Sequence, residues 1–283
     1  MSFQPAFKQK AASTPQISMD ILAKLETLFT SKKWEIDTRK GMSLYNRFCN
    51  TLLKFEVEEQ LFLLELTQRF IKIDIDKYLP IFEDLAYQIR SDYPGVDIIF
   101  APCLPKEDLG VMKSARVALY QMEAPSYSFD WGNCWIEKDD IAKKVKFIKD
   151  DTIVVLVDDF VGTGETAIGA VHYVNEVIGS DFSNDRIKVL AIVALCAGKQ
   201  ALSDIGVQVY SKYEFNKGIS DYFEGDALVD AKTKMETIES KLKVKKGFRF
   251  GYGSSEALVC MVRCPNNTFP VYWLGKKTAP YER

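Results

Sequence analysis

The sequence predicts an α/β protein with a doubly wound, mainly parallel sheet, an N-terminal helical region and a C-terminal extension. Two aliphatic runs, residues 153–157 and 186–196, carry almost no polar interruption, which is typical of parallel strands buried on both faces. Between residues 95 and 210, strand patterns also alternate with helical patterns. Such alternation is the signature of βαβ units, and it decides the predicted fold class.

Composition and charge narrow the classes of protein. The chain has 283 residues, 47% hydrophobic and 27% charged, which fits one large globular domain or a domain with an appendage. A net charge of −2 provides no overall basic field for nucleic acid or an anionic membrane. No apolar run reaches the length of about 18 residues that a membrane span needs, so no membrane association is predicted.

Cysteine and histidine usage bears on location and metals. The six cysteines are scattered without a CxxC pair, and residues 1–14 lack an apolar signal core. We therefore expect a reduced, cytoplasmic protein. With His172 as the single histidine, a zinc site is not expected.

Before the first strand, the chain divides into a flexible lead, residues 1–17, and a helical region, residues 18–92. Apolar residues recur at helical spacing, and Ser18 is placed to cap the first helix. Four helices are predicted: the first begins at Ser18, the second spans Ser43–Leu53, the third spans Glu56–Ile71, and the fourth runs from near Asp74 to Ser91. These helices either pack onto the rest of the chain or form a docking surface for a partner protein.

Residues 93–283 form the predicted α/β domain, with an extension over residues 219–283. The extension carries a helix predicted for Ala227–Lys243 and an aromatic tail. The other elements are predicted from residue patterns: strands at 96–102, 153–157, 186–196 and 207–210, a short strand within 127–135, and helices at 114–122, 165–178 and 199–205. Gly179 is expected to stop the helix that begins at Glu165.

The chemistry concentrates where the central strand is expected to end. Asp158 and Asp159 follow the aliphatic run directly, and the glycine–threonine loop (residues 162–166) then opens a helix. Glycines let the backbone approach an anion, and free N–H groups at a helix start attract phosphate. Two carboxylates would repel a bare phosphate, but they can accept hydrogen bonds from sugar hydroxyls. The segment therefore favours a sugar phosphate.

This segment resembles the signature of type I phosphoribosyltransferases, which binds the ribose 5-phosphate part of phosphoribosyl pyrophosphate. The resemblance implies that Asp158 and Asp159 contact the ribose hydroxyls. It also implies that the loop formed by Gly162, Thr163, Gly164, Glu165 and Thr166 holds the 5-phosphate. Phe160 and Val161 are expected to pack beneath this loop. Gly162 departs from the pattern, because the family often has threonine there.

The resemblance also implies Mg²⁺ as cofactor, a pyrophosphate loop after an earlier strand, and a hood over the base. The pyrophosphate loop would lie between Pro102 and Ala115, where Lys106 and Lys113 are the cations. Lys113 with Ser114 at a helix start is the better candidate. Each lysine taken alone could equally be a solvated surface residue. The sequence identifies no protein ligand for the metal.

The tail, with Gly251–Val259, Pro265–Thr268 and Trp273, resembles a narrower group of uncharacterised bacterial phosphoribosyltransferase-like proteins, some thought to serve antiviral defence beside retron reverse transcriptases. Tail aromatics such as Phe250, Tyr252 and Trp273 either stack on a base or pack in a core. Two functions thus stand together: transfer of a phosphoribosyl group to an unknown acceptor, or a regulatory or effector role in a retron-type defence complex. The sequence leaves the acceptor, catalytic activity and a homo-oligomeric state open.

Overall fold

A five-stranded parallel sheet forms the centre of the protein. The computed structural model describes residues 16–39, 43–126, 133–179, 181–275, 279–281 and 283. Every pairing within this sheet is parallel, in the order β3-β2-β4-β5-β6. The strands are β2 (Ile98–Pro102), β3 (Cys134–Ile136), β4 (Ile153–Val161), β5 (Ile187–Leu195) and β6 (Gln208–Phe215). The predicted parallel sheet is confirmed.

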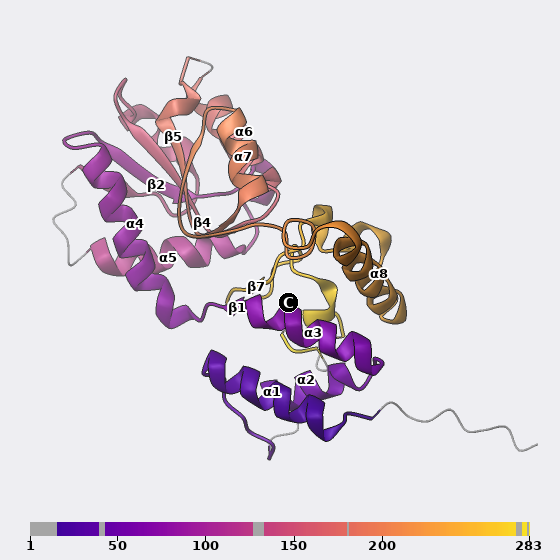
Figure 1. The fold of residues 1–283 in the computed structure, drawn as a ribbon. Coiled ribbons are helices and arrows are strands. Elements are labelled where there is room, and N and C mark those ends of the chain that lie inside the picture. Colours follow the sequence, from indigo (N-terminus) through magenta and orange to yellow (C-terminus); the bar gives the residue numbers. More distant parts are fainter. Residues whose placement is uncertain (1–15, 40–42, 127–132, 180, 276–278, 282) are drawn as a thin grey trace, which may run out of the picture.

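Helices cover both faces of the sheet, as Figure 1 shows. Val155 and Val157 of β4 pack with α4 (Tyr78–Asp92) and α5 (Ser114–Ser126) on one face. Their neighbours Val154 and Leu156 pack with α6 (Glu165–Ile178) and α7 (Cys196–Asp204) on the other. Because successive side chains of a strand point to opposite faces, residues 153–157 of β4 must be apolar without interruption. The doubly wound arrangement predicted from the aliphatic runs is confirmed.

A second lobe joins the two ends of the chain. It contains α1 (Met19–Lys32), α2 (Leu44–Leu52), α3 (Val57–Arg69), α8 (Gly225–Lys241) and the C-terminal tail, which lie together below the sheet in Figure 1. Leu25 and Phe70 share one core with Ile238, Tyr272 and Tyr281. The short strands β1 (Ile71–Lys72) and β7 (Val259–Cys260) pair in parallel and link the two ends. The helical region and the extension therefore stabilise each other.

The division of the chain at residue 93 stays a prediction, and the packing groups its neighbours differently. The first three helices pack with the tail, whereas α4 packs on the sheet. Connecting 3-10 turns complete the chain: η1 (Ile75–Lys77), η2 (Lys106–Asp108), η3 (Ile141–Phe147), η4 (Asn184–Arg186), η5 (Lys246–Phe248), η6 (Tyr252–Ser254) and η7 (Pro270–Tyr272).

Several predicted boundaries are reproduced. Ser18 caps α1 by accepting a hydrogen bond from the Ile21 N–H, and α6 spans the predicted residues. Gly179 ends α6 with φ of 122°, a backbone conformation that favours glycine.

Three predicted boundaries are wrong. The helix expected to reach Ile71 ends at Arg69, because Ile71 pairs with Val259 in the small sheet. The strand β6 continues to Phe215 instead of ending at Tyr210, since β5 offers pairing partners along its whole length. The strand β4 continues to Val161, past the carboxylates that were expected to end it. Of the short strand expected within 127–135, residues 127–132 lie outside the described part of the chain.

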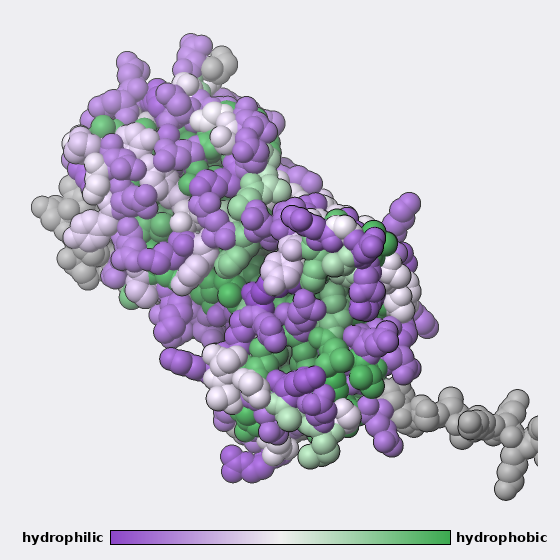
Figure 2. Space-filling model, viewed as in Figure 1, coloured by the Kyte–Doolittle hydropathy of each residue, from purple (hydrophilic) through white to green (hydrophobic). Residues whose placement is uncertain are grey.

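The surface mixes polar and apolar residues. Figure 2 shows hydrophilic residues over both lobes, with hydrophobic residues gathered near α3 and at the seam between the lobes. Among the described residues, we find no helix with the length and apolarity to cross a membrane.

Candidate active site at the carboxyl end of the sheet

A cleft of about 1310 Å³ opens at the carboxyl end of β4, where the sheet meets the C-terminal tail. The carboxyl ends of parallel strands are where open α/β sheets place their ligands. One wall is the segment from Asp158 to Ala167, which covers the end of β4 and the start of α6 and which we call the floor. The opposite wall is formed by residues 261–267, which we call the tail strap. The cleft thus lies between a sheet motif and a segment about a hundred residues later in the chain.

Asp158 and Asp159 lie inside β4 and are only 8% and 7% exposed. One oxygen of Asp158 accepts from the Ser114 hydroxyl and from the Asp159 backbone N–H, each at 2.8 Å. Asp159 Oδ2 accepts from the Tyr78 hydroxyl at 2.7 Å. Across the described ranges, no lysine or arginine forms an ion pair with either carboxylate.

Burial raises the pKa of both carboxyls. For Asp158 the burial cost is followed by repulsion from Asp159, and together they hold its pKa well above the ordinary value. Burial also raises the pKa of Asp159, opposed by the hydrogen bond from Tyr78. The pKa of Tyr78 is raised by its own burial and by the Asp159 charge, so this hydroxyl stays a neutral donor. A ligand that brings hydroxyl donors or positive charge would offset the strain of two adjacent buried carboxylates.

The glycine–threonine loop connects β4 to α6. Gly164 occupies the N-cap of α6 with φ of 88°, and its carbonyl accepts from the Ile168 N–H at 2.8 Å. The first N–H groups of α6 have no partner within the helix, so the loop presents donors to the cleft. Gly198 of α7 backs the loop so closely that a Cβ there would lie 2.2 Å from the Gly162 carbonyl oxygen. The loop is therefore held against the body of the protein.

The tail strap explains why glycine stands at position 162. A Cβ on Gly162 would lie 2.5–2.6 Å from the side chain of Asn267, closer than real Cβ contacts come. Asn267 is itself fixed, because its amide donates to Ser255 Oγ at 3.1 Å. The departure from the threonine common in phosphoribosyltransferases thus follows from the packing of the tail on the loop.

Two further contacts join the tail to the cleft floor. The Val262 N–H donates to the Tyr78 hydroxyl at 3.3 Å, so that Tyr78 bridges the tail strap and Asp159. The Tyr252 hydroxyl donates to Glu165 Oε2 at 2.7 Å, at the first residue of α6. Both the carboxylates and the glycine–threonine loop are therefore connected to the tail.

The structure separates the two lysines predicted for the pyrophosphate loop. Lys113 lines the cleft and pairs with Asp108 at 3.1 Å, and its neighbour Ser114 bonds to Asp158. Lys106 instead pairs with Glu176 on the outer side of α6 and is not among the cleft-lining residues that the structure describes. The structure therefore does not bring Lys106 to the described cleft lining, because Lys106 begins the 3-10 turn η2, which packs against α6.

The remaining predicted residues come together, and some contributors had no sequence signal. Phe160, Val161 and the loop from Gly162 to Thr166 all line the cleft, as do Tyr252 and Trp273, whereas Phe250 packs in the core of the second lobe. Tyr78 and Arg263 were missed. Tyr78 lies in a predicted helix without a motif, and Arg263 lies between the two quoted tail segments. The folded chain reveals Tyr78 by its bond to Asp159 and Arg263 by its place in the cleft lining.

Comparison with known proteins places the chain among phosphoribosyltransferase-like proteins. The model of the PRTase-CE family matches residues 55–282. The chain belongs to the PRTase-CE family. The predicted phosphoribosyltransferase-like family is thereby confirmed, while the defence-associated branch stays a prediction. The comparison with curated proteins gave no match.

Solved structures with similar folds include two orotate phosphoribosyltransferases and an adenine phosphoribosyltransferase. The orotate enzyme from Aeropyrum pernix is 16% identical, with a TM-score of 0.28, and the match covers 56% of this chain and 72% of that one. The orotate enzyme from Mycobacterium tuberculosis H37Rv, in complex with inorganic phosphate, is 17% identical, with a TM-score of 0.28, and the match covers 46% of this chain and 68% of that one. The adenine enzyme from Thermoanaerobacter pseudethanolicus ATCC 33223 is 16% identical, with a TM-score of 0.27, and the match covers 47% of this chain and 80% of that one.

Proposed function

We propose that this PRTase-CE protein binds phosphoribosyl pyrophosphate in the cleft and transfers its phosphoribosyl group to an acceptor. One observation carries the proposal. Two buried carboxylates without a cationic partner in the described chain adjoin a glycine-rich loop at a helix N-terminus. Carboxylates suit the ribose hydroxyls, and the loop suits the 5-phosphate, so one ligand satisfies both groups.

The residues would act by position and charge. Asp158 and Asp159 accept hydrogen bonds from the ribose hydroxyls, and Tyr78 and Ser114 hold the carboxylates in place. During transfer, the bond from C1 to the pyrophosphate oxygen breaks and a bond from C1 to the acceptor nucleophile forms. Positive charge develops at C1, and nearby fixed carboxylates stabilise it. We assign no general base.

The residues present fit Mg²⁺ only together with the substrate. The described residues contain no group of three or more His, Cys, Asp or Glu that could hold a metal by themselves. Asp158 and Asp159 provide hard oxygen ligands, and Mg²⁺ commonly combines one or two carboxylates with substrate phosphates and water. Bound in this way, the ion would offset the negative charge of the pyrophosphate.

Calorimetric titration with phosphoribosyl pyrophosphate and Mg²⁺ tests this function. We expect saturable binding by the native protein and none by the double variant Asp158→Asn, Asp159→Asn. Asparagine retains an oxygen for the bonds from Ser114 and Tyr78. Because both carboxyls have a raised pKa in the folded state, removing their charges should not lower the melting temperature.

The chain supplies a matched control for the double variant. Asp150 and Asp151 are also adjacent aspartates, but they lie exposed before the opposite end of β4. Asp150→Asn with Asp151→Asn changes the net charge equally and should leave binding unchanged. Undiminished binding by the Asp158 and Asp159 variant would overturn the proposed function.

A second candidate function is participation in a defence complex through the N-terminal helices. A groove of about 530 Å³ lies between α1 and α3, with Leu28, Leu61 and Leu64 on its walls. Deleting these helices would expose the core that they share with the tail, so a surface change is the cleaner test. Leu61→Glu should abolish co-purification of a host partner. Leu53→Glu, at 38% exposure against 37% for Leu61 and outside the groove, should retain it.

A further inference from the structure

Within the described part of the chain, one cationic side chain that lines the cleft has no partner. Its lining includes Lys113, Arg263 and Arg283. Lys113 pairs with Asp108, and the Arg283 guanidinium lies over the Trp273 ring, 5.0 Å from its centroid. Arg263 is exposed and, within the described chain, makes no hydrogen bond, ion pair or ring contact. It is therefore free to meet a ligand.

The backbone at Arg263 is fixed although its side chain is not. Met261 and Cys264 on either side are buried, at 1% and 2% exposure. The preceding residue, Val262, donates its N–H to the Tyr78 hydroxyl, which in turn donates to Asp159. The Tyr78 hydroxyl thus links the backbone next to Arg263 to Asp159. The two carboxylates accept from Ser114 and Tyr78, and within the described residues Arg263 forms no ion pair with either of them.

The course of the tail strap indicates which part of the ligand Arg263 would meet. At one end, Asn267 packs on Gly162 of the loop that is proposed to hold the 5-phosphate. At the other end, Val262 is tied to the carboxylates that are proposed to hold the ribose hydroxyls. Arg263 therefore lies at the ribose end of the strap, away from the 5-phosphate. The anionic group expected on that side of the ribose is the pyrophosphate on C1.

We infer that Arg263, from the C-terminal tail, binds the pyrophosphate of the donor. This inference rests on the proposed function. An arginine can offer two parallel N–H donors to phosphate oxygens, which gives both charge and direction. It would add a cation to Lys113, the better candidate of the predicted pyrophosphate loop, whereas Lys106 pairs with Glu176 and is not among the described residues that line the cleft. The tail would then help to decide that a pyrophosphate-bearing donor binds in preference to a plain ribose phosphate.

Three probes separate this role from a structural one: phosphoribosyl pyrophosphate, ribose 5-phosphate and inorganic pyrophosphate, each titrated calorimetrically with Mg²⁺. Arg263→Gln should weaken binding of the two pyrophosphate-bearing probes by roughly 10- to 100-fold, the value of a lost charge-assisted hydrogen bond. The affinity of Arg263→Gln for ribose 5-phosphate should equal that of the native protein. Arg263→Lys should restore part of the loss, because it keeps the charge without the paired donors.

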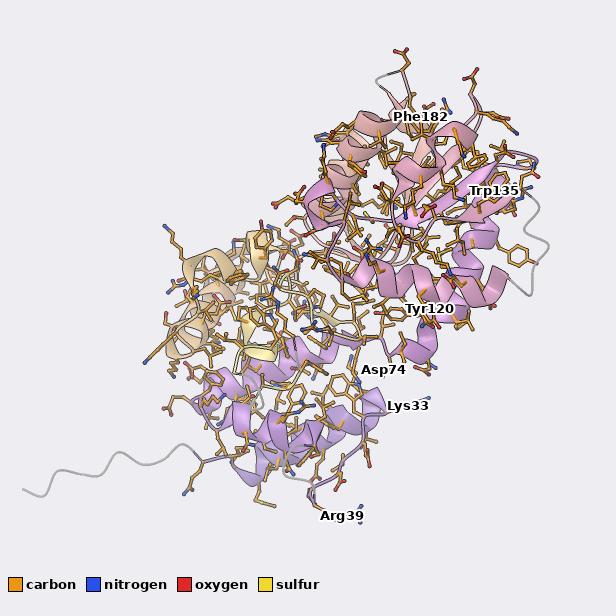
Figure 3. The ribbon with its side chains drawn as sticks, turned by 180° about the vertical axis from the view of Figure 1, so that it is seen from behind. Lys33, Arg39, Asp74, Tyr120, Trp135 and Phe182 are labelled. Carbon is orange, nitrogen blue, oxygen red and sulfur yellow. The ribbon has the colours of Figure 1, made fainter. Side chains whose placement is uncertain are left out.

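Arg39→Gln is the control for removal of an arginine charge. Arg39 lies at the far end of the helical lobe in Figure 3, and its side chain is 90% exposed. Its substitution should change none of the three affinities, so any general effect of net charge would show there.

The outcomes distinguish the two proposals. Native protein that binds none of the probes would overturn the proposed function, and this inference with it. Native protein that binds phosphoribosyl pyrophosphate, with undiminished affinity in Arg263→Gln, would overturn the inference alone. An equal loss for ribose 5-phosphate and phosphoribosyl pyrophosphate would do the same, because it would show a general disturbance of the cleft.

Discussion

The two walls of the cleft are built in different ways. The floor, from Asp158 to Ala167, is one continuous segment that contains the end of a central strand and the start of a helix. The tail strap crosses from the second lobe and is placed by contacts with residues far away in sequence, such as Tyr78 and Gly162. The floor therefore carries a recognisable local motif. The strap gains its role only from where the chain folds.

The two regions also use buried carboxyls differently. On the floor, Asp158 and Asp159 line the cleft. In the tail, Glu256 holds the fold together, because it accepts hydrogen bonds from the N–H groups of Ile219 and Ser220 at 2.8 and 2.6 Å. Glu239 of α8 accepts from the Phe250 N–H at 2.8 Å and so holds the start of the tail. The comparison suggests that floor carboxyls affect binding, whereas tail carboxyls affect stability.

The largest effect is expected at the contact between the walls. Gly162→Thr introduces a side chain where Asn267 already stands, and we expect a loss of about 1–3 kcal/mol in unfolding free energy. Ligand affinity should fall as well, because the loop must shift. Urea denaturation measures the first effect and calorimetry the second.

Two further variants sharpen this result. Asn267→Ala in the Gly162→Thr background should recover part of the loss, since it removes the obstructing amide. Gly110→Ala is the matched control, because a Cβ there meets nothing within 4 Å. If Gly162→Thr proved as stable as Gly110→Ala, the close packing of strap and loop would be wrong.

A smaller effect is expected at Glu239 of α8, a buried carboxyl that lacks a full set of hydrogen-bond partners in the described chain. Glu239 is fully buried, and its Oε2 has no hydrogen-bond partner in the described chain. Burial raises its pKa to about 7. The folded state then keeps a proton that the unfolded state releases above about pH 4.5, so the unfolding free energy falls as pH rises from there to about 7.

Glu239→Gln should remove this pH dependence, which we expect to be on the order of 2 kcal/mol. Urea denaturation of both proteins at pH 5 and pH 8 measures the difference. The native protein should lose more stability than the variant between these values. Equal slopes for the two proteins would show that Glu239 is ionised in both the folded and the unfolded states.

The smallest effect is expected at the exposed link between Tyr252 and Glu165. Tyr252→Phe removes a hydroxyl that donates to the first residue of α6, but water can replace this exposed bond. We expect unchanged stability and a change of less than about threefold in the affinity for phosphoribosyl pyrophosphate. A change beyond tenfold would show that the tail orders the loop through this bond and is as important for binding as the segment from Asp158 to Ala167.

Sequence reasoning recovered the parts of the site that depend on local pattern. The buried strand, the adjacent carboxylates and the loop were all placed correctly in one cleft, although β4 extends past the carboxylates to Val161. Lys106 instead pairs with Glu176, because proximity in sequence to Pro102 does not decide which way a turn directs a side chain. Tyr78 was missed because a single tyrosine in a helix has no periodicity that marks a function.

By itself, the sequence determined the alternation of strands and helices, the parallel sheet and the glycine–threonine loop that opens a helix. These features follow from hydrophobic period and backbone chemistry, which act over a few residues. Only the tertiary structure decided that the N-terminal helices and the tail share a core, that Asn267 requires glycine at position 162, and that Arg263 faces the cleft unpaired. Such contacts join segments distant in the chain, and their selection depends on packing of the whole molecule.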